Sequence, residues 1–490
     1  MSSTSHSKKQ WDPRWDGLPR KIRLLITQYL IQDGCPLAPL ATVSREMQTD
    51  IERHNFAWIR LTPSRLASFR AMIQRTRGLV GYIWFCLELD DTSDEFTEGC
   101  EISGTDKCPI TASFQDLFSV LGEWEPHGDL TLDISLYSTS DSDIVGHAIE
   151  KASRKYHDPK HGWLNGSRHL ASPPWALRKL FHLIMEQGPH DSDQGELDWW
   201  DQLPSVPAVT SLLLRQQNRR RWKPVSLAHM FAQFPRLQEL HYEPWREWED
   251  WTQDPTDREY KHLFESIQRS NKSLRKLYPA NMRPYGNYGG FLAGTHAFRE
   301  PVRAVGQMIA LASLKLEHLA ASYITDTSHF FEIRSEWAWP NLKSLTLTAK
   351  ILTPDKVDST GIGALLLAAA AAAEKMPRLE TMDIWNGRKG LAALFRYQVF
   401  RNEGEAVLTW RGTLDLAMEP AVIQAWQVVT KQYDISRLDV VVERLYGAII
   451  RSHGDAIQHL GLSSQVIRPV SLQQIRINQK ALEGVATVES

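Results

Sequence analysis

Aliphatic residues recur at helical spacing close to the start of the chain. Between Ile22 and Leu30 they fall three and four residues apart, which places them along one face of a helix. Leu18-Pro19 predicts the start of that helix, because proline suits the first turn, where its missing N–H costs no hydrogen bond. Asp33-Gly34 predicts its end. The pattern therefore predicts one amphipathic helix with a continuous apolar stripe.

Two further short helices are predicted directly after it. Apolar residues from Leu37 to Val43 continue the spacing through a segment that prolines interrupt. Ser44 is a suitable amino-terminal cap for a third helix, which would turn Met47 and Ile51 inward. Three short helices cannot bury a wide apolar stripe against one another. The surplus apolar surface must therefore contact either the rest of the chain or another protein.

Downstream, short strand-like apolar runs alternate with helical stretches, which is typical of a parallel sheet with helices on its outer side. The spacing Leu-x-x-Leu-x-Leu, with similar residues allowed, begins at Val209, Leu237, Leu316, Leu342 and Leu379. A further copy at Leu274 is hidden because proline occupies position 279. The intervals are irregular, so the pattern predicts an uneven solenoid that resembles leucine-rich repeats.

Other strands and helices extend this array. Residues 79–89 and 129–137 read as two earlier strands, the second with strict apolar alternation. Thr256 and Glu259 form a capping box before a helical apolar stripe, and residues 365–376 predict another helix. Helix signals therefore lie between the predicted strands.

A terminal cap is predicted for the open end of the array. From Asp434 onward, apolar residues between Leu438 and Ile450 occur at helical spacing, and residues 471–481 suggest one more helix. The predicted division is a disordered start at 1–12, a three-helix module at 13–62, the solenoid at 63–433 and a helical cap and tail at 434–490.

Composition fits an ordinary soluble globular protein, with 42% hydrophobic and 23% charged residues. The 56 lysines and arginines nearly balance the 58 acidic residues, so no overall field attracts nucleic acid or a membrane. The first ten residues lack the apolar run of a secretory leader. The four cysteines show no C-x-x-C spacing. An intracellular protein, cytoplasmic or nuclear, is expected.

Motifs for catalysis are missing from the sequence. It contains no G-x-S-x-G, no H-E-x-x-H and no P-loop, and Pro159 separates His157 from His161, which argues against a shared helical face for a metal. We therefore expect no catalytic residue, no metal and no cofactor. A basic cluster between Arg215 and Lys223 is either a solvated loop or a site that binds acidic partners, acts in nuclear import or contacts nucleic acid.

The amino-terminal module resembles the F-box, which opens with Leu-Pro, continues with an aliphatic helix and a Leu-x-x-Leu-x-x-Val segment, and carries a late tryptophan, here Trp58. Lys21 and Met47 stand where many F-boxes have an acidic and an aromatic residue. The resemblance implies docking onto a Skp1-type linker. The residues it assigns to docking are Leu18, Pro19, Ile22, Leu25, Ile26, Leu30, Leu37, Leu40 and Val43.

Phrases at 37–45, 54–57, 61–66 and 241–248 are similar to those of a large group of F-box proteins from filamentous fungi. That resemblance implies an α/β fold, namely an F-box followed by an irregular leucine-rich-repeat-like solenoid of parallel strands and outer helices. It also implies a non-enzymatic substrate adaptor of a cullin-type (SCF) ubiquitin ligase. An interaction scaffold unconnected to ubiquitin remains the alternative.

A substrate surface is predicted on the side of the strands opposite the leucines. In a repeat strand the leucines point into the core, so the intervening residues face the concave surface, where such arrays bind partners. The candidate substrate-binding residues are Arg215, Glu239, His241, Glu243, His318, Thr346, Asp383 and Trp385.

Overall fold

The computed structural model describes residues 15–89, 109–138, 193–215, 221–244, 253–281, 302–332, 334–352, 359–462, 466–473 and 475–476. It also describes three short strands, β4 (Trp163–Leu164), β5 (Ser167–Arg168) and β6 (Leu183–Ile184). Predictions for residues 1–12, His157 and His161 lie outside these ranges.

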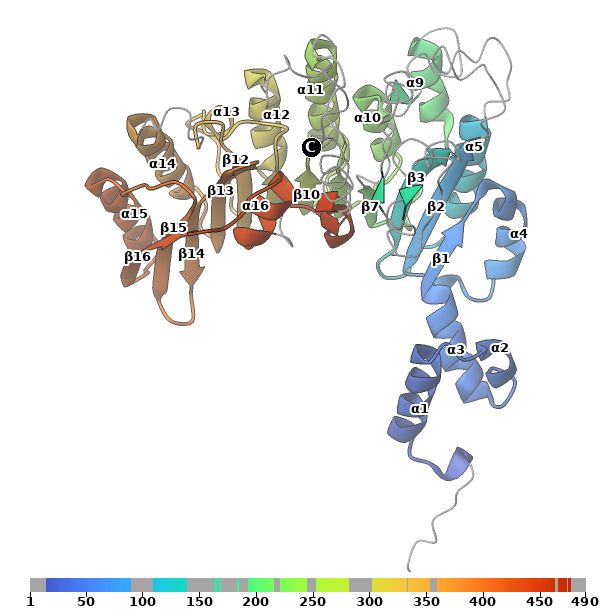
Figure 1. Ribbon diagram of the computed structural model, residues 1–490. Helices are drawn as coiled ribbons and strands as arrows, with labels where there is room; N and C mark the ends of the chain where they lie inside the picture. The colour runs from blue at the N-terminus through green and yellow to red at the C-terminus, as the bar shows by residue number, and fades with distance from the viewer. Residues whose placement is uncertain are drawn as a thin grey trace, which may run out of the picture.

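A small helical module forms the amino-terminal end. After a turn of 3-10 helix at Trp15–Gly17, it consists of α1 (Arg20–Gln32), α2 (Leu37–Leu40) and α3 (Arg45–Ala57). The Ser44 hydroxyl accepts a hydrogen bond from the Met47 N–H at 3.1 Å, so the predicted cap of α3 is confirmed. The module projects from one end of a large sheet (Figure 1).

The sheet contains twelve strands within the described residues, in the order β1-β2-β3-β7-β9-β10-β11-β12-β13-β14-β15-β16. The strands preceding the carboxyl-terminal hairpins are β1 (Trp58–Leu61), β2 (Tyr82–Leu89), β3 (Thr131–Ser138), β7 (Ser211–Leu214), β9 (Glu239–Tyr242), β10 (Lys276–Pro279), β11 (His318–Ala321) and β12 (Ser344–Thr348). All neighbouring pairs among these are parallel. The predicted mixed α/β fold with a mostly parallel sheet is confirmed.

The last strands depart from that pattern. β13 (Thr381–Arg388), β14 (Leu391–Phe400) and β15 (Glu405–Gly412) are antiparallel neighbours, and β16 (Arg437–Arg444) then pairs with β15 in parallel. The two hairpins were not predicted from the sequence. The leucine spacing marks β13, but β14 and β15 carry no such repeat, although their residues alternate between the two faces of the sheet.

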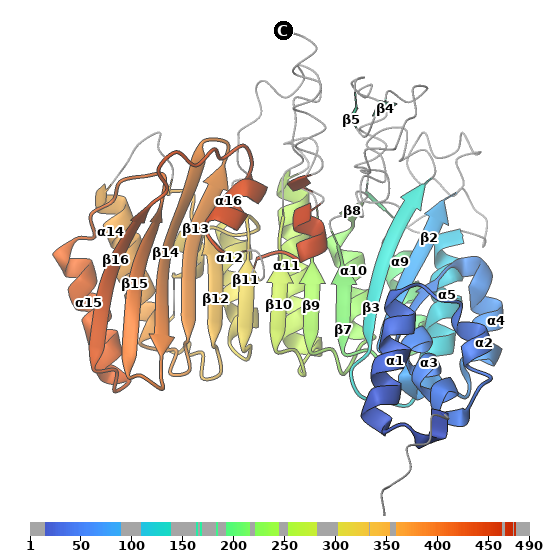
Figure 2. The ribbon, with the colours of Figure 1, turned by 60° about the horizontal axis from the view of Figure 1, so that its bottom comes forward.

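Most helices cover one face of the sheet (Figures 1 and 2). They are α4 (Pro63–Ile73), α5 (Pro109–Gly122), α9 (Asp193–Gln202), α10 (Pro224–Ala232), α11 (Gln253–Ser270), α12 (Arg303–Ser313), α13 (Thr327–Phe330), α14 (Ser359–Ala373) and α15 (Pro420–Gln432). Between the layers lies one hydrophobic core that runs from Leu61 to Ile435. No described helix combines the length and apolar character needed to cross a membrane.

The strand register explains how the repeats build this core. Leu345 of β12 lies beside Leu319 of β11 and Met382 of β13, and all three face the helices. The predicted hidden strand at Leu274 exists as β10, where Leu277 pairs with Leu240 of β9. Equivalent positions of successive repeats therefore form continuous apolar rows across the sheet.

The carboxyl-terminal prediction was wrong in its secondary structure. Residues 437–444 form β16 rather than a helix, and the next helix is α16 (His453–His459). The apolar run Val440–Val442 is compatible with the period of a helix and with that of a strand. It forms a strand because its backbone pairs with the free edge of β15. Rather than covering the end of the array, α16 packs on the opposite face of the sheet, over β13 and β14 (Figure 2).

Candidate functional site

The predicted docking residues lie on the outside of the amino-terminal module. None of the nine is buried: Leu18, Ile26, Leu30, Leu37 and Leu40 are half-buried, and Pro19, Ile22, Leu25 and Val43 are exposed. Ile22, Leu25 and Val43 expose 42%, 48% and 61% of their surface. Large aliphatic side chains are usually buried, so this apolar surface is available to another molecule.

An ion pair joins α1 to α3, and α1 buries little of its own surface. Thr27 is the one residue of α1 that is buried, and its hydroxyl donates to the Arg23 carbonyl. Arg23 forms an ion pair of 2.9 Å with Glu46 of α3. Inside the module, α3 contributes Met47 and Ile51, as predicted. Within the α1 stripe, Ile22 and Leu25 therefore stay exposed, whereas Ile26 and Leu30 are half-buried.

The candidate substrate-binding residues share the sheet face opposite the main helical layer, but they differ in exposure. Arg215, Glu239 and His318 are half-buried, whereas His241, Glu243, Thr346, Asp383 and Trp385 are buried. The prediction that all eight form an open surface needs correction, because neighbouring side chains and the carboxyl-terminal segment cover five of them. Only Arg215, Glu239 and His318 remain accessible to a partner.

Asp133 of β3 organises the first part of this face. Its carboxylate is fully buried and accepts hydrogen bonds from the Arg215 guanidinium, at 3.1 Å from Nε, and from the Tyr82 hydroxyl. Burial, reinforced by the Asp133 charge, raises the pKa of Tyr82. The sequence patterns did not identify Asp133 as a site residue, because its partners are 51 and 82 residues away.

Aromatic and arginine side chains gather beside Asp133. The guanidinium groups of Arg60 and Arg215 each lie 5.0 Å from the centre of the Trp84 ring, within the range of a cation–π contact. Trp58 stacks on Tyr82 at 6.0 Å and exposes 49% of its surface. This cluster was not predicted, although the alternation in residues 79–89 could have placed Tyr82 and Trp84 on one face.

A second polar group spans β9 to β11. In the strand register Lys276 lies beside both Glu239 and His318. Glu239 accepts hydrogen bonds from His241 at 2.6 Å and Lys276 at 3.0 Å, and these contacts lower the pKa of Glu239 to about 2. His241 also stacks on the Tyr278 ring at 4.4 Å.

The remaining predicted residues are buried inside the fold, and the Thr346 hydroxyl has no hydrogen-bond partner among the described residues. Asp383 accepts two hydrogen bonds from Arg396, at 2.7 and 3.0 Å. The Trp385 ring belongs to a second apolar core between the sheet and α16. Glu243 accepts from the backbone N–H of Arg468 at 2.8 Å and from the Ser471 hydroxyl. These side chains stabilise the fold, and the carboxyl-terminal segment is what covers two of them.

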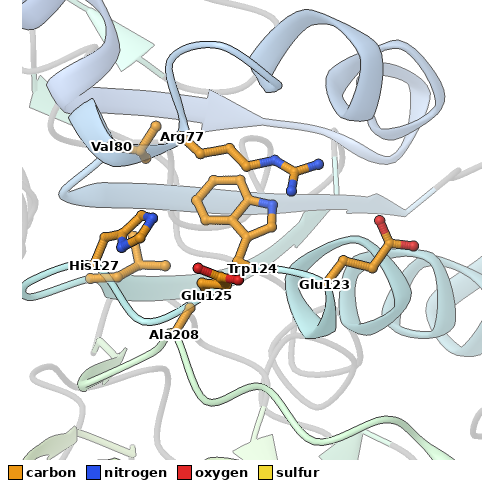
Figure 3. A pocket seen from close by; sticks show the side chains of 8 residues that line it. Arg77, Val80, Glu123, Trp124, Glu125, His127 and Ala208 are labelled. Carbon is orange, nitrogen blue, oxygen red and sulfur yellow. The ribbon is translucent and has the colours of Figure 1, made fainter.

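A pocket of about 230 Å³ lies where β2 and β3 begin (Figure 3). Its lining consists of Arg77, Val80, Glu123, Trp124, Glu125, His127, Leu130 and Ala208. Trp124 Nε1 and Arg77 Nε are buried and have no hydrogen-bond partner among the described residues. The pocket thus offers N–H donors to a small acceptor group. The sequence patterns gave no indication of it.

Within the described ranges, no group of three or more His, Cys, Asp or Glu residues could hold a metal ion. Cys35 and Cys86 are free thiols. Arg221 and Lys223 of the basic cluster are buried, so these two do not belong to a solvated loop. Arg219 and Arg220 lie outside the described residues.

Comparison with known proteins gives one family match. Residues 253–468 are similar to a family of unknown function (DUF6546). The matched region begins with α11 and ends at Arg468, so it contains the second half of the sheet and α16. A search of curated proteins gives no match.

Proposed function

We propose that this protein is a substrate-recognition adaptor of a cullin-type (SCF) ubiquitin ligase. In this proposal α1 to α3 are an F-box that docks a Skp1-type linker. The sheet and its outer helices act as an irregular leucine-rich-repeat-like solenoid that holds a protein substrate. The chain itself contributes proximity, because it raises the effective concentration of substrate lysines near an enzyme held elsewhere in the complex.

The observation that carries the proposal is the exposed stripe of the amino-terminal module. Its sequence spacing resembles the F-box, and Ile22, Leu25 and Val43 remain exposed in the folded chain. Burying one leucine or isoleucine in an interface contributes about 1.5 to 3 kcal/mol. Burial of Ile22, Leu25 and Val43 in an interface would therefore contribute favourable free energy to a complex.

Substrate recognition is assigned to the open part of the sheet face. Arg215, Glu239 and His318 are half-buried there, and Trp58 adds an exposed ring at the same face. Polar groups held by neighbours, together with exposed aromatic rings, are typical of specific protein interfaces. In this proposal the substrate contacts this face, while the linker contacts the exposed side chains of α1.

Co-expression with a Skp1-type linker tests the docking step. We expect the full chain to co-purify with the linker, and the variants Ile22→Asp and Leu25→Asp each to weaken the complex about 10- to 100-fold. Both side chains are already exposed, so the variants should fold normally. The matched control is Val428→Asp on α15, where the valine is 53% exposed and far along the chain from the module.

Two results would count against the adaptor. Either the wild-type chain never recovers the linker, or the α1 variants recover it as well as the Val428→Asp control does. If the linker is not bound while a substrate still binds the sheet face, the scaffold unconnected to ubiquitin becomes the better description.

A further inference from the structure

The carboxyl-terminal segment crosses the recognition face in a fixed position. The Glu243 carboxylate, only 1% exposed, accepts from the Arg468 backbone N–H and from the Ser471 hydroxyl. On either side of Arg468, the side chains of Ile467 and Leu472 are buried in the second apolar core. The backbone that carries the Arg468 side chain is therefore held at the end of β9.

The Arg468 guanidinium itself forms no hydrogen bond or ion pair with the described residues, and Arg468 is half-buried. Burial raises the pKa of Tyr82 and of Tyr278, and the positive charge of Arg468 acts against that rise in both. The guanidinium therefore lies within electrostatic reach of hydroxyls on β2 and β10.

The carboxylates near this position already have partners. Asp133 is bound by Arg215 and Tyr82, Glu239 by His241 and Lys276, and Glu243 by the segment's own backbone and Ser471. Arg468 is thus a positive charge at this face that no carboxylate among the described residues neutralises. This part of the face is therefore expected to attract an anionic group.

We propose that Arg468 binds an anionic side chain of the substrate protein, either a carboxylate or a phosphorylated hydroxyl. This inference rests on the proposed function, since it names the chemistry that the recognition face selects. The planar guanidinium donates two parallel hydrogen bonds to either group. The Tyr278 hydroxyl and the Lys276 ammonium, whose side chain is 44% exposed, lie on the neighbouring strand as further donors.

The neighbouring aromatic cluster accounts for the rest of the contact. Trp58 and Trp84 lie on the same face at β1 and β2, where Trp58 remains 49% exposed. An extended substrate segment with its anionic group at Arg468 could place an apolar residue on these rings. The site therefore favours a peptide over a free anion.

Binding of short peptides to the purified full chain tests the inference. The probes are acetyl-Ala-Ala-X-Ala-Ala-amides, with X as glutamate, phosphoserine or the neutral glutamine, titrated calorimetrically at low salt. We expect the wild type to prefer at least one anionic peptide over the glutamine peptide by about tenfold, and Arg468→Gln to abolish that preference. The control Arg258→Gln removes the same charge from the exposed face of α11 and should keep the preference.

Comparison of the two anionic probes identifies the source of the charge. A stronger preference for phosphoserine points to a phosphorylated substrate, and equal preference points to acidic residues. Equal binding of all three peptides by the wild type, including no binding at all, would overturn the inference. So would a preference that survives in Arg468→Gln. Linker co-purification is measured separately, so loss of the ligase proposal is distinguishable from loss of this site.

Discussion

At the scale of single residues, this protein places its charged and apolar side chains in unexpected positions. Asp133, Asp383 and Glu243 expose at most 1% of their surface, and each carboxylate accepts hydrogen bonds. By contrast, Ile22 and Leu25 expose more than 40% of their surface. Buried carboxylates are tolerated only with partners, whereas exposed aliphatic groups in a row indicate an interface.

His453 gives the fold a dependence on pH. It lies inside the interface between α16 and the sheet, and burial lowers the pKa of its imidazole to about 3. The unfolded chain, with a histidine pKa of about 6.5, binds more protons than the folded chain between these values. The contribution of neutral His453 to the free energy of unfolding is therefore fully present above about pH 6.5. It decreases by about 1.4 kcal/mol for each pH unit as the pH falls toward the folded-state pKa.

The variant His453→Gln should lose this contribution. Urea denaturation between pH 4 and 6.5 should show a free energy of unfolding that depends less steeply on pH, by about one proton, than in the wild type. His459→Gln serves as the control, because that histidine is exposed on the same helix. Identical pH slopes for His453→Gln and the wild type would show that His453 is not buried as a neutral group.

At the scale of elements, α16 packs on the sheet at a point where no side chain fits. A Cβ added at Gly387 of β13 would lie 2.3 Å from the Cβ of Ala456 in α16. Trp385 and Leu394 complete the apolar contact on the sheet side. Close packing of this kind makes the position of the carboxyl-terminal segment sensitive to one methyl group.

Gly387→Ala should therefore loosen α16 from the sheet. We expect a loss of about 1 to 3 kcal/mol, seen as faster hydrogen exchange in residues 453–460. Adding Ala456→Gly should restore part of the protection, because it removes the clashing methyl group at a helical cost of about 1 kcal/mol. Unchanged exchange in Gly387→Ala would contradict close packing of α16 against β13 at this point.

At the scale of the whole molecule, stability is divided unevenly. One apolar core joins the helices and strands from Leu61 to Ile435, and a second lies beneath α16. From α1 to α3, only Phe56 packs against the main core. The amino-terminal module is thus attached through the end of α3 and has little apolar burial of its own.

Hydrogen exchange should reveal this division. We expect amides in residues 20–57 to open at free energies at least about 2 kcal/mol below those of β9 to β15, because few buried contacts oppose local opening. Addition of the linker should raise protection in the module and leave the sheet unchanged. Uniform protection across the chain would argue against a separate docking module.

The sequence by itself determined the positions of the repeat strands and the apolar stripe. The leucine spacing identified β7 and β9 to β13, because the residues that fill a shared core must recur at each strand. It also identified β10, although Pro279 interrupts the leucine pattern there. Helical spacing likewise identified α1 and its apolar side. Both signals are local, so they can be read without knowing what each segment contacts.

Tertiary structure alone decided which polar residues remain accessible. Strand alternation correctly assigned Glu243, Asp383 and Trp385 to the face opposite the core, but the same pattern suits a solvated surface and a covered one. Arg396 covers Asp383, and the carboxyl-terminal segment, more than 200 residues away in sequence, covers Glu243. The Val440–Val442 strand was missed for the same physical reason, since the partner that satisfies its backbone is remote in sequence.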